Sequence, residues 1–303
     1  MSIQTIAVFR VHPSGAAWCC SGGMAPTLRS LGYRVLDCGD PRQTSTPIEH
    51  LQQADFIIMN AVEWYDEVLT NRYGLQAWQA LKAPKATWYA ESAHRDDRNF
   101  PFERCRPLAD RHYFPAAQDA VEFDGEWLPF GADVSVFKAK SVEKRYDAAF
   151  LGMMYPKRAE YMSRIGYPLQ ILPPVSDPDP LHSFELLAEA YSATRIFVNL
   201  PSYSRLLVTK VTEVMACRTL LVTPRVDHPS GAHNMSQFTD GKHLVYYDGA
   251  RPGDIGDIVE HYLRSPGELD AIAGAGMEEV ARAHTLALRL EKIIGDAASP
   301  TRQ

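Results

Sequence analysis

Short apolar strands alternate with helical patterns along most of this chain, and this alternation restricts the fold more than any other feature of the sequence. In the first half, the runs that read as buried strands are Thr5–Val11, Tyr33–Cys38, Asp55–Val62 and Lys85–Ala90. The pattern starts again in the second half, with strands expected at Tyr146–Leu151, Leu169–Leu172 and Arg195–Leu200. Strands that alternate with helices favour parallel sheets, so we expect an α/β protein with two such domains.

Two segments of the chain interrupt the alternation, and one of them suggests where the chain divides. The segment Lys138–Arg145 is rich in Lys and Ser and reads as a linker, which predicts an N-terminal domain at 1–135 and a C-terminal domain at 136–303. Between His94 and His112 the apolar periodicity fails, and five arginines stand among four acidic residues. We expect this second segment to be a solvated, charged loop.

The composition excludes several classes of protein. With 46% hydrophobic and 22% charged residues the chain has the composition of a globular protein, and no apolar run approaches the ~20 residues of a membrane-spanning helix. The N-terminus lacks the basic flank and cleavage site of a signal peptide, so we expect a cytoplasmic protein without a membrane span. Five cysteines without zinc-type spacing predict reduced thiols, and a net charge of −6 argues against a general polyanion binder.

The stretch Arg205–Pro224 reads as a helix that leads directly into an apolar strand, with Ser204 as its expected N-cap. Apolar residues recur at helical spacing on one side, whereas Thr209, Lys210 and Glu213 share the other side. A lysine near a helix N-terminus suits a phosphate, and a carboxylate one turn later suits the vicinal hydroxyls of a ribose. The alternative is a solvated Lys210/Glu213 surface pair.

Polar and aromatic residues follow the strands of the first half, where ligands gather in parallel sheets. They are Ser14, Trp18, Glu63, Trp64, Glu91 and His94. Trp18, Trp64 and Tyr65 present faces on which a sugar or a planar compound would pack, although aromatic residues in such numbers are usually part of a core.

Several segments of the second half resemble, in order and spacing, the motifs of spore-maturation-type (group 1-like) glycosyltransferases. These segments are PFGADVSVF, YDAAFLGMMYPKR, TKVTEVMACRTLLVTP, FTDGKHLVYYD and AHTLALRL, over roughly residues 129–290. The resemblance implies a GT-B fold, with two Rossmann-like domains facing a cleft and a C-terminal helix that crosses back to the first domain. It also implies transfer of a hexose or pentose from a nucleotide-diphosphate sugar, of the UDP type, to an acceptor.

The resemblance assigns donor contacts to particular residues of the second half. Glu213 stands where such enzymes hold the ribose of the donor, and Lys210 stands where they usually place an arginine, which removes the bidentate fork. Arg218 replaces a glycine, so either the backbone is less tight there or Arg218 contacts the donor. A phosphate-binding turn is expected at Gly152, with two cations, Lys157 and Arg158, beside it.

The same resemblance guides the expected chemistry. Negative charge develops on the leaving diphosphate, and cations with backbone N–H groups would stabilise it without a metal. The pair Asp177 and Asp179 resembles a metal-binding D-x-D motif, but its proline-rich setting is equally typical of a turn.

The proton of the acceptor hydroxyl would pass either to a base or to an oxygen of the donor phosphate, and a base would come from the first domain. Glu91 and His94 are the candidates, with Asp96 and Asp97 as further choices. The alternatives are a carboxylate that caps a turn and an exposed histidine.

Three other functions stay open from the sequence. A sugar-nucleotide epimerase or hydrolase shares the two-domain plan, and so does a non-catalytic sugar-nucleotide-binding protein. A third alternative is a hydroxylated base in viral DNA as the acceptor, which the seven basic residues between Lys138 and Arg164 permit but do not favour. The sequence leaves the acceptor and the oligomeric state unknown.

Overall fold

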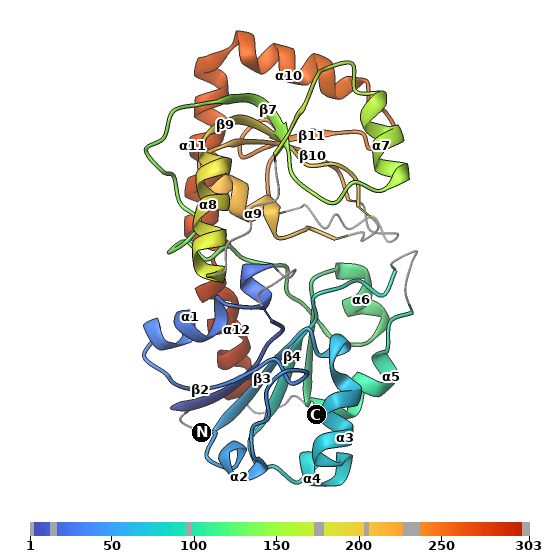
Figure 1. The fold of residues 1–303 in the computed structure, drawn as a ribbon, viewed down its shortest axis with the longest axis vertical. Helices are drawn as coiled ribbons and strands as arrows, with labels where there is room; N and C mark the ends of the chain where they lie inside the picture. Colours follow the sequence, from blue (N-terminus) through green and yellow to red (C-terminus); the bar gives the residue numbers. More distant parts are fainter. Residues whose placement is uncertain are drawn as a thin grey trace. The chain divides into compact units, whose positions relative to one another are not determined.

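The computed structural model describes residues 3–12, 17–94, 99–172, 179–202, 206–226 and 237–298. The chain forms two compact units, each built on its own parallel sheet (Figure 1). The first unit comprises Met1–Gly131, Tyr203–Leu206 and Leu286–Gln303, and the second comprises Ala132–Ser202 and Leu207–Thr285. The expected α/β class with two Rossmann-like sheets is therefore confirmed.

Six parallel strands form the sheet of the first unit, in the order β2-β1-β3-β4-β5-β6. They are β1 Thr5–Phe9, β2 Arg34–Gly39, β3 Phe56–Asn60, β4 Lys85–Trp88, β5 Arg111–Phe114 and β6 Glu126–Trp127. Every residue of β1, β3 and β4 is buried, as expected for central strands that are covered on both faces. The carboxyl ends of β3 and β4 are joined because the side chain of Asn60 donates to the carbonyl of Trp88 at 2.9 Å.

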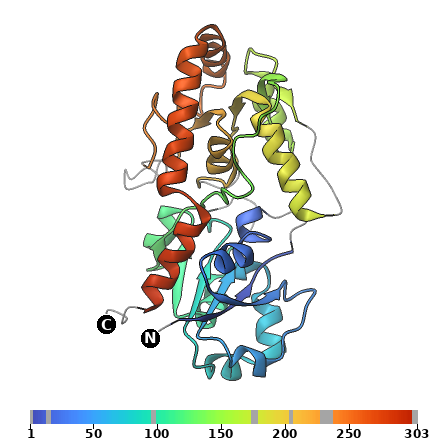
Figure 2. The ribbon, with the colours of Figure 1, turned by 90° about the vertical axis from the view of Figure 1, so that its left-hand side faces the viewer.

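Helices cover both faces of this sheet. They are α1 Met24–Ser30, α2 Ile48–Leu51, α3 Asp66–Tyr73, α4 Leu75–Gln79, α5 Phe102–Cys105, α6 Ala117–Glu122 and α12 Leu286–Ala298, with 3-10 turns η1 Trp18–Cys20, η2 Val62–Trp64 and η3 Arg106–Leu108. In Figures 1 and 2, α12 runs beside α1. The apolar stripe of α12, which includes Leu286, Leu290 and Ile293, is buried.

Polar contacts also attach α12 to the first unit. The hydroxyl of Tyr113 donates to Asp296 at 2.9 Å, and Lys292 donates to Glu126 at 2.9 Å. The Arg289 side chain donates to the carbonyl of Pro129 at 2.8 Å. The chain therefore returns to its first unit, as expected for the C-terminal helix.

Five parallel strands form the sheet of the second unit, in the order β11-β10-β9-β7-β8. They are β7 Tyr146–Phe150, β8 Gln170–Ile171, β9 Thr194–Val198, β10 Leu220–Pro224 and β11 Val245–Tyr247. The helices are α7 Pro156–Ser163, α8 Pro180–Ser192, α9 Lys210–Ala216, α10 Asp254–Arg264 and α11 Pro266–Ala283. β11 pairs in parallel with β10, so the last strand of this sheet runs in the same direction as the others.

Two local predictions were wrong. Helix α9 begins at Lys210 rather than near Arg205, because Leu206 and Leu207 are buried in non-helical backbone. Ser204, the expected N-cap, lies outside the described residues, and Thr209 occupies the N-cap position without a side-chain bond. The expected solvated loop after His94 contains α5 and η3, since Phe102, Cys105 and Leu108 recur every three residues and are buried among the charges.

Candidate functional site

The turn after β7 gathers three of the predicted donor residues. A Cβ placed on Gly152 would lie 2.8 Å from the ring of Phe150 and 3.3 Å from both Nη1 of Arg158 and Nζ of Lys210. A larger residue would therefore displace both cations. Gly152, Arg158 and Lys210, together with Glu213, are called the cation turn below.

Arg158 is held firmly at this turn. Its side chain is buried, with the residue 7% exposed, and its guanidinium donates to the carbonyls of Met153 and Pro201, the latter at 3.0 Å. The guanidinium also stacks on the ring of Tyr155, 4.4 Å from its centroid. Lys157, the neighbouring cation, is exposed. Of the two cations expected beside the glycine, only Arg158 therefore belongs to the cluster.

Lys210 approaches the same turn from α9. Its Nζ donates to the carbonyl of Leu151 at 2.8 Å. Burial, with a smaller contribution from Arg158, lowers the pKa of Lys210 to about 8, and Glu213 opposes this change. Because an ammonium group has three donors, two remain for a ligand within the described part of the chain.

Glu213 lies one turn after Lys210 and is 5% exposed, so the alternative of a solvated surface pair is wrong. Burial raises the pKa of Glu213 to about 8, against the attraction of Lys210. The carboxyl group makes no hydrogen bond with any described residue. A buried carboxyl without a partner is unusual in folded proteins, and a ligand with hydroxyl groups would supply the missing bonds.

The end of α9 answers a question that the sequence leaves open. Arg218 follows the helix with φ of 55°, in the left-handed region that glycine prefers, and its side chain is exposed. The backbone is therefore as tight as a glycine would make it, so the expectation of a looser turn is wrong. Lys210 and Arg218 lie at opposite ends of α9.

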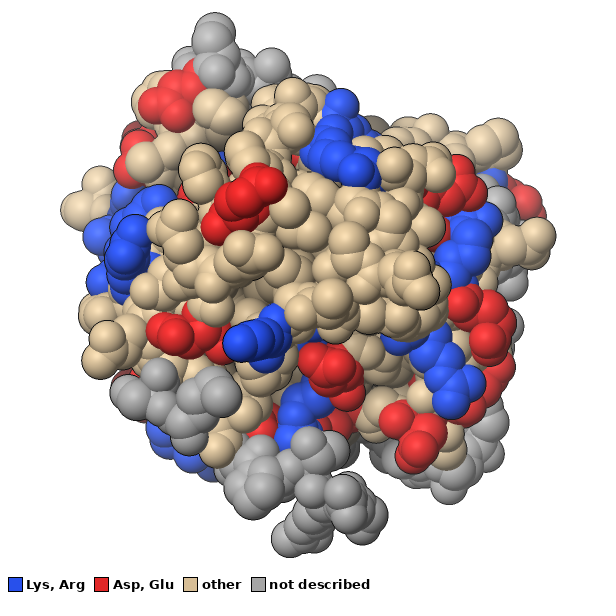
Figure 3. Space-filling view, turned by 90° about the horizontal axis from the view of Figure 1, so that it is seen from below, with Lys and Arg blue, Asp and Glu red and all other residues tan. Residues whose placement is uncertain are grey.

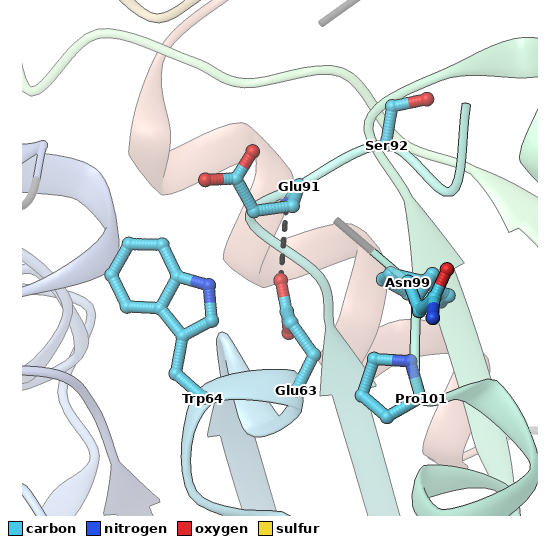
Figure 4. Close-up of a pocket in the computed structure, with 7 residues that line it drawn as sticks. Glu63, Trp64, Glu91, Ser92, Asn99 and Pro101 are labelled. Atoms are coloured by element: carbon cyan, nitrogen blue, oxygen red, sulfur yellow. Dashed lines mark hydrogen bonds between the residues drawn. The ribbon is translucent and has the colours of Figure 1, made fainter. Parts of the chain in front are cut away.

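In the first unit, the carboxyl ends of β3 and β4 border a small pocket of about 100 Å³ (Figure 4). Its lining comprises Glu63, Trp64, Glu91, Ser92, Asn99, Phe100 and Pro101. Figure 4 shows Glu63 beneath the backbone of Glu91, with Trp64 on one side and Asn99 on the other. The structure thus brings together Glu63, Trp64 and Glu91 of the residues expected at this edge.

Glu63 and the turn that carries it are strained and buried. Ala61, which links β3 to η2, has φ of 57°. Glu63 is 9% exposed, and burial raises its pKa to about 8 against the N–H groups of Ala90 and Glu91. Its Oε1 accepts from Ala90 at 2.7 Å and from Glu91 at 3.0 Å, while Oε2 is buried without a partner among the described residues.

His94 lies farther along the same edge. Its Nε2 is 2.7 Å from a carboxylate oxygen of Glu122 and 3.7 Å from Asp119. Asp119 is fully buried, and burial raises its pKa. Asp119 and Glu122 were not among the residues predicted from the sequence. Their position on α6, directly after β5 at the carboxyl edge, was the available signal.

The other expected residues of the first half are not part of the pocket. Trp18 is buried, and Cβ atoms on Gly22 and Gly23 would collide with its ring, so it is packed in the core of its unit. The hydroxyl of buried Tyr65 donates to the carbonyl of Asn60 at 2.8 Å. Ser14, Asp96 and Asp97 lie outside the described residues.

The D-x-D segment gives no support to a metal site. Asp177 lies outside the described part of the chain, and Asp179 caps α8 by accepting from the N–H of Leu181 at 3.0 Å. Within the described ranges, no three His, Cys, Asp or Glu side chains come together as metal ligands would.

Comparisons with known proteins agree with this architecture. Residues 176–295 match the family described as "Glycosyl transferase-like". A search of curated proteins gives no sequence match.

Solved structures resemble the whole chain. Sucrose-phosphate synthase from Thermosynechococcus elongatus is 15% identical, with a TM-score of 0.64, and the match covers 98% of this chain and 100% of that one. An alpha-glucosyltransferase in complex with UDP-glucose and DNA containing an abasic site is 12% identical, with a TM-score of 0.68 and coverage of 97% and 99%. HepE from Anabaena in complex with UDP and glucose is 11% identical, with a TM-score of 0.65 and coverage of 98% and 100%. The chain therefore has the GT-B glycosyltransferase fold that the resemblance predicted, and its residues 176–295 match a glycosyl transferase-like family model.

Proposed function

We propose that this protein transfers a sugar from a UDP-type nucleotide sugar to a hydroxyl group of an acceptor. The second unit would bind the donor, and the first unit would bind the acceptor. The observation that carries the proposal is the cation turn, where a glycine, the buried Arg158, the half-buried Lys210 and a carboxyl without a hydrogen-bond partner among the described residues meet beside the carboxyl end of β7.

Each part of the cation turn suits one part of such a donor. The absence of a Cβ at Gly152 lets a diphosphate approach the backbone, and Arg158 and Lys210 offset the negative charge that grows as the sugar departs. A protonated Glu213 would both donate to and accept from the hydroxyl groups of a ribose. We propose that these cations stabilise the leaving diphosphate without a metal ion.

On the acceptor side, we propose Glu91 and His94 as the groups that receive the acceptor's proton. Both follow β4 at the carboxyl edge of the first sheet, and Glu91 lines the pocket. The ring of Trp64 offers a face for a sugar or another flat acceptor.

DNA is a less favoured acceptor for this chain, although several structures of the similar alpha-glucosyltransferase contain it. In the basic stretch 138–164, Arg158 is buried and Lys144 donates to the carbonyl of Thr194, so two of its cations face the protein rather than solvent. On the face shown in Figure 3, Lys and Arg are interspersed with Asp and Glu. A DNA acceptor would require binding that weakens steeply as salt is raised.

Among the described helices, none combines the length and apolar character that crossing a bilayer requires. All five cysteines are buried free thiols, which supports our proposal of a cytoplasmic, reducing location.

A thermal-shift panel tests the donor assignment. A ligand that binds only the folded state raises the melting temperature in proportion to its affinity, so UDP and UDP sugars should raise it whereas NAD should not. A result with no shift for any nucleotide sugar would overturn the proposal.

Product analysis then separates the remaining alternatives. Incubation with the donor alone detects an epimerase or a hydrolase, because such an enzyme consumes the sugar nucleotide without an acceptor. Donor binding without turnover under any condition would instead indicate a non-catalytic binding protein.

A further inference from the structure

The segment 90–94 after β4 is held by side chains rather than by the sheet. The last backbone bond of the ladder runs from the N–H of Tyr89 to the carbonyl of Tyr113. Beyond it, the N–H groups of Ala90 and Glu91 both donate to Oε1 of Glu63, at 2.7 and 3.0 Å. One carboxyl oxygen therefore fixes the backbone that carries Glu91.

A second buried carboxyl fixes the rest of the segment. Oδ2 of Asp119 accepts from the N–H of Ala93 at 2.9 Å, and Oδ1 lies 3.4 Å from the hydroxyl of Ser92. The same hydroxyl accepts from the N–H of His94 at 3.2 Å. Four backbone N–H groups in five consecutive residues thus depend on two carboxyls and one hydroxyl.

This arrangement is costly for the fold. Both carboxyls are removed from water, which raises the pKa of each, and Oε2 of Glu63 has no partner among the described residues. Ala61, two residues before Glu63, adopts a left-handed conformation that brings η2 beneath the segment. A loop that only connects two elements needs none of these features, because ordinary turns satisfy their N–H groups by backbone bonds or by water.

Neither carboxyl is placed to react with a substrate. Oε1 of Glu63 is occupied by two N–H groups and Oε2 is buried, while Asp119 is fully buried. Glu91 and His94, the residues that the two carboxyls hold, are half-buried. A role in aiming these two side chains therefore fits the geometry better than a role in chemistry.

We propose that Glu63 and Asp119 are positioning residues that hold the segment 90–94 so that Glu91 and His94 keep fixed places at the carboxyl edge of the first sheet. This inference rests on the proposed sugar transfer, in which Glu91 and His94 receive the acceptor's proton. Fixed placement matters there because a small displacement of a reacting group lowers the rate much more than it lowers the binding of the donor.

The test compares Glu63→Ala with Glu63→Gln. Glutamine keeps an oxygen that accepts both N–H groups, whereas alanine removes it. For each variant we measure the hydrogen-exchange rates of the amides of residues 90–94 and the Kd of UDP. We also measure kcat for sugar transfer from the UDP sugar that gives the largest thermal shift. Glu103→Gln, an exposed glutamate on α5, is the matched control.

In Glu63→Ala we expect the amide hydrogens of residues 90 and 91 to exchange at least tenfold faster than in the wild type. The kcat should fall at least tenfold, while the Kd of UDP changes less than twofold. Glu63→Gln should recover most of the protection and most of kcat. If Glu63→Ala does not fold, Ser92→Ala tests the other end of the segment, because it removes the acceptor of the His94 N–H.

Three results would overturn the inference. The first is an unchanged hydrogen-exchange rate in Glu63→Ala, and the second is a wild-type kcat in that variant despite faster exchange. The third is a kcat of Glu63→Gln as low as that of Glu63→Ala, which would mean that Glu63 acts through its own proton. Failure of the proposed function is distinguishable from failure of this inference, because the wild type would then neither bind nor consume UDP sugars. The hydrogen-exchange measurement would still show whether Glu63 holds the segment 90–94.

Discussion

Each unit of this protein buries one glutamate beside the carboxyl ends of its strands, and the two differ in what their oxygens contact. Glu63 and Glu213 are both less than a tenth exposed, and burial raises the pKa of each to about 8. Glu63 accepts two N–H groups from its own unit, whereas Glu213 has no hydrogen-bond partner among the described residues.

The difference indicates how to interpret a buried carboxyl. Burial and a raised pKa are common to both residues, so neither property distinguishes a structural group from a ligand-binding one. The hydrogen-bond partners make the distinction. Glu63 is already used by the fold, whereas the carboxyl of Glu213 makes no hydrogen bond with the described residues and is, in our proposal, the group that binds the donor beside Arg158 and Lys210.

The largest expected effect is one that both glutamates share. A carboxyl with a folded pKa of about 8 keeps its proton in the folded state, while the unfolded chain releases it near pH 4.5. The stability that each group contributes is therefore complete below pH 4.5 and is lost as the pH rises toward 8, with a slope approaching about 1.4 kcal/mol per pH unit. Glu63→Gln and Glu213→Gln should each reduce the slope with which the free energy of unfolding falls as the pH rises. Urea titrations between pH 5.5 and 7.5 measure this slope.

The control for this measurement is Glu103→Gln, whose exposed carboxyl should leave the slope unchanged. Flattening by only one of the two variants would mean that the other carboxyl is hydrated in solution. The statement that both glutamates are buried with a raised pKa would then be wrong for that residue.

The second prediction separates the two glutamates. Glu213→Ala should weaken the binding of UDP at least tenfold, about 1.4 kcal/mol, because it removes the acceptor for the ribose hydroxyls while the fold loses no hydrogen bond. Glu63→Gln should change the same Kd less than twofold. Isothermal titration calorimetry measures both values, and equal affinities for wild type and Glu213→Ala would return Glu213 to the class of structural residues.

A third prediction concerns the cations near Glu213. Arg158→Lys keeps the charge but loses the planar fork and the stacking on Tyr155, so the Kd of UDP should rise about fivefold. Lys157→Ala removes an exposed charge and should change it less than twofold. Both effects should disappear when uridine replaces UDP, because uridine carries no phosphate. An equal loss for the two variants would show that the buried position of Arg158 has no special role.

The fold and much of the cation turn could be predicted from the sequence for a physical reason. Parallel strands bury both faces and read as continuous apolar runs, and a helix that packs on them carries a periodic stripe, as Leu286 and Leu290 of α12 do. The cation turn follows from the same regularity. Gly152 lies two residues after the end of β7, and Lys210 and Glu213 are one helical turn apart.

The remainder depends on contacts between segments that are distant in the chain. Nothing in the sequence near Glu63 indicates that its oxygen accepts from residues 90 and 91, which follow another strand. For the same reason Asp119 was missed and Trp18, a core residue, was selected. The short helix α5 and the turn η3 were hidden because their three buried residues are separated by charged residues.

The smallest expected effect concerns Arg218 and tests whether the proposed donor site extends to the far end of α9. Arg218 adopts a left-handed conformation that costs a residue with a Cβ about 1 kcal/mol relative to glycine. Arg218→Gly should therefore raise the free energy of unfolding by about 0.5–1 kcal/mol, and Arg218→Ala, which keeps the strain and loses the charge, should not. Because Lys210 begins the helix and Arg218 lies beyond its other end, neither variant should change the Kd of UDP. A weaker Kd in both variants would extend the donor site to Arg218, and the glycine missing from this position would then have been replaced for the sake of a ligand.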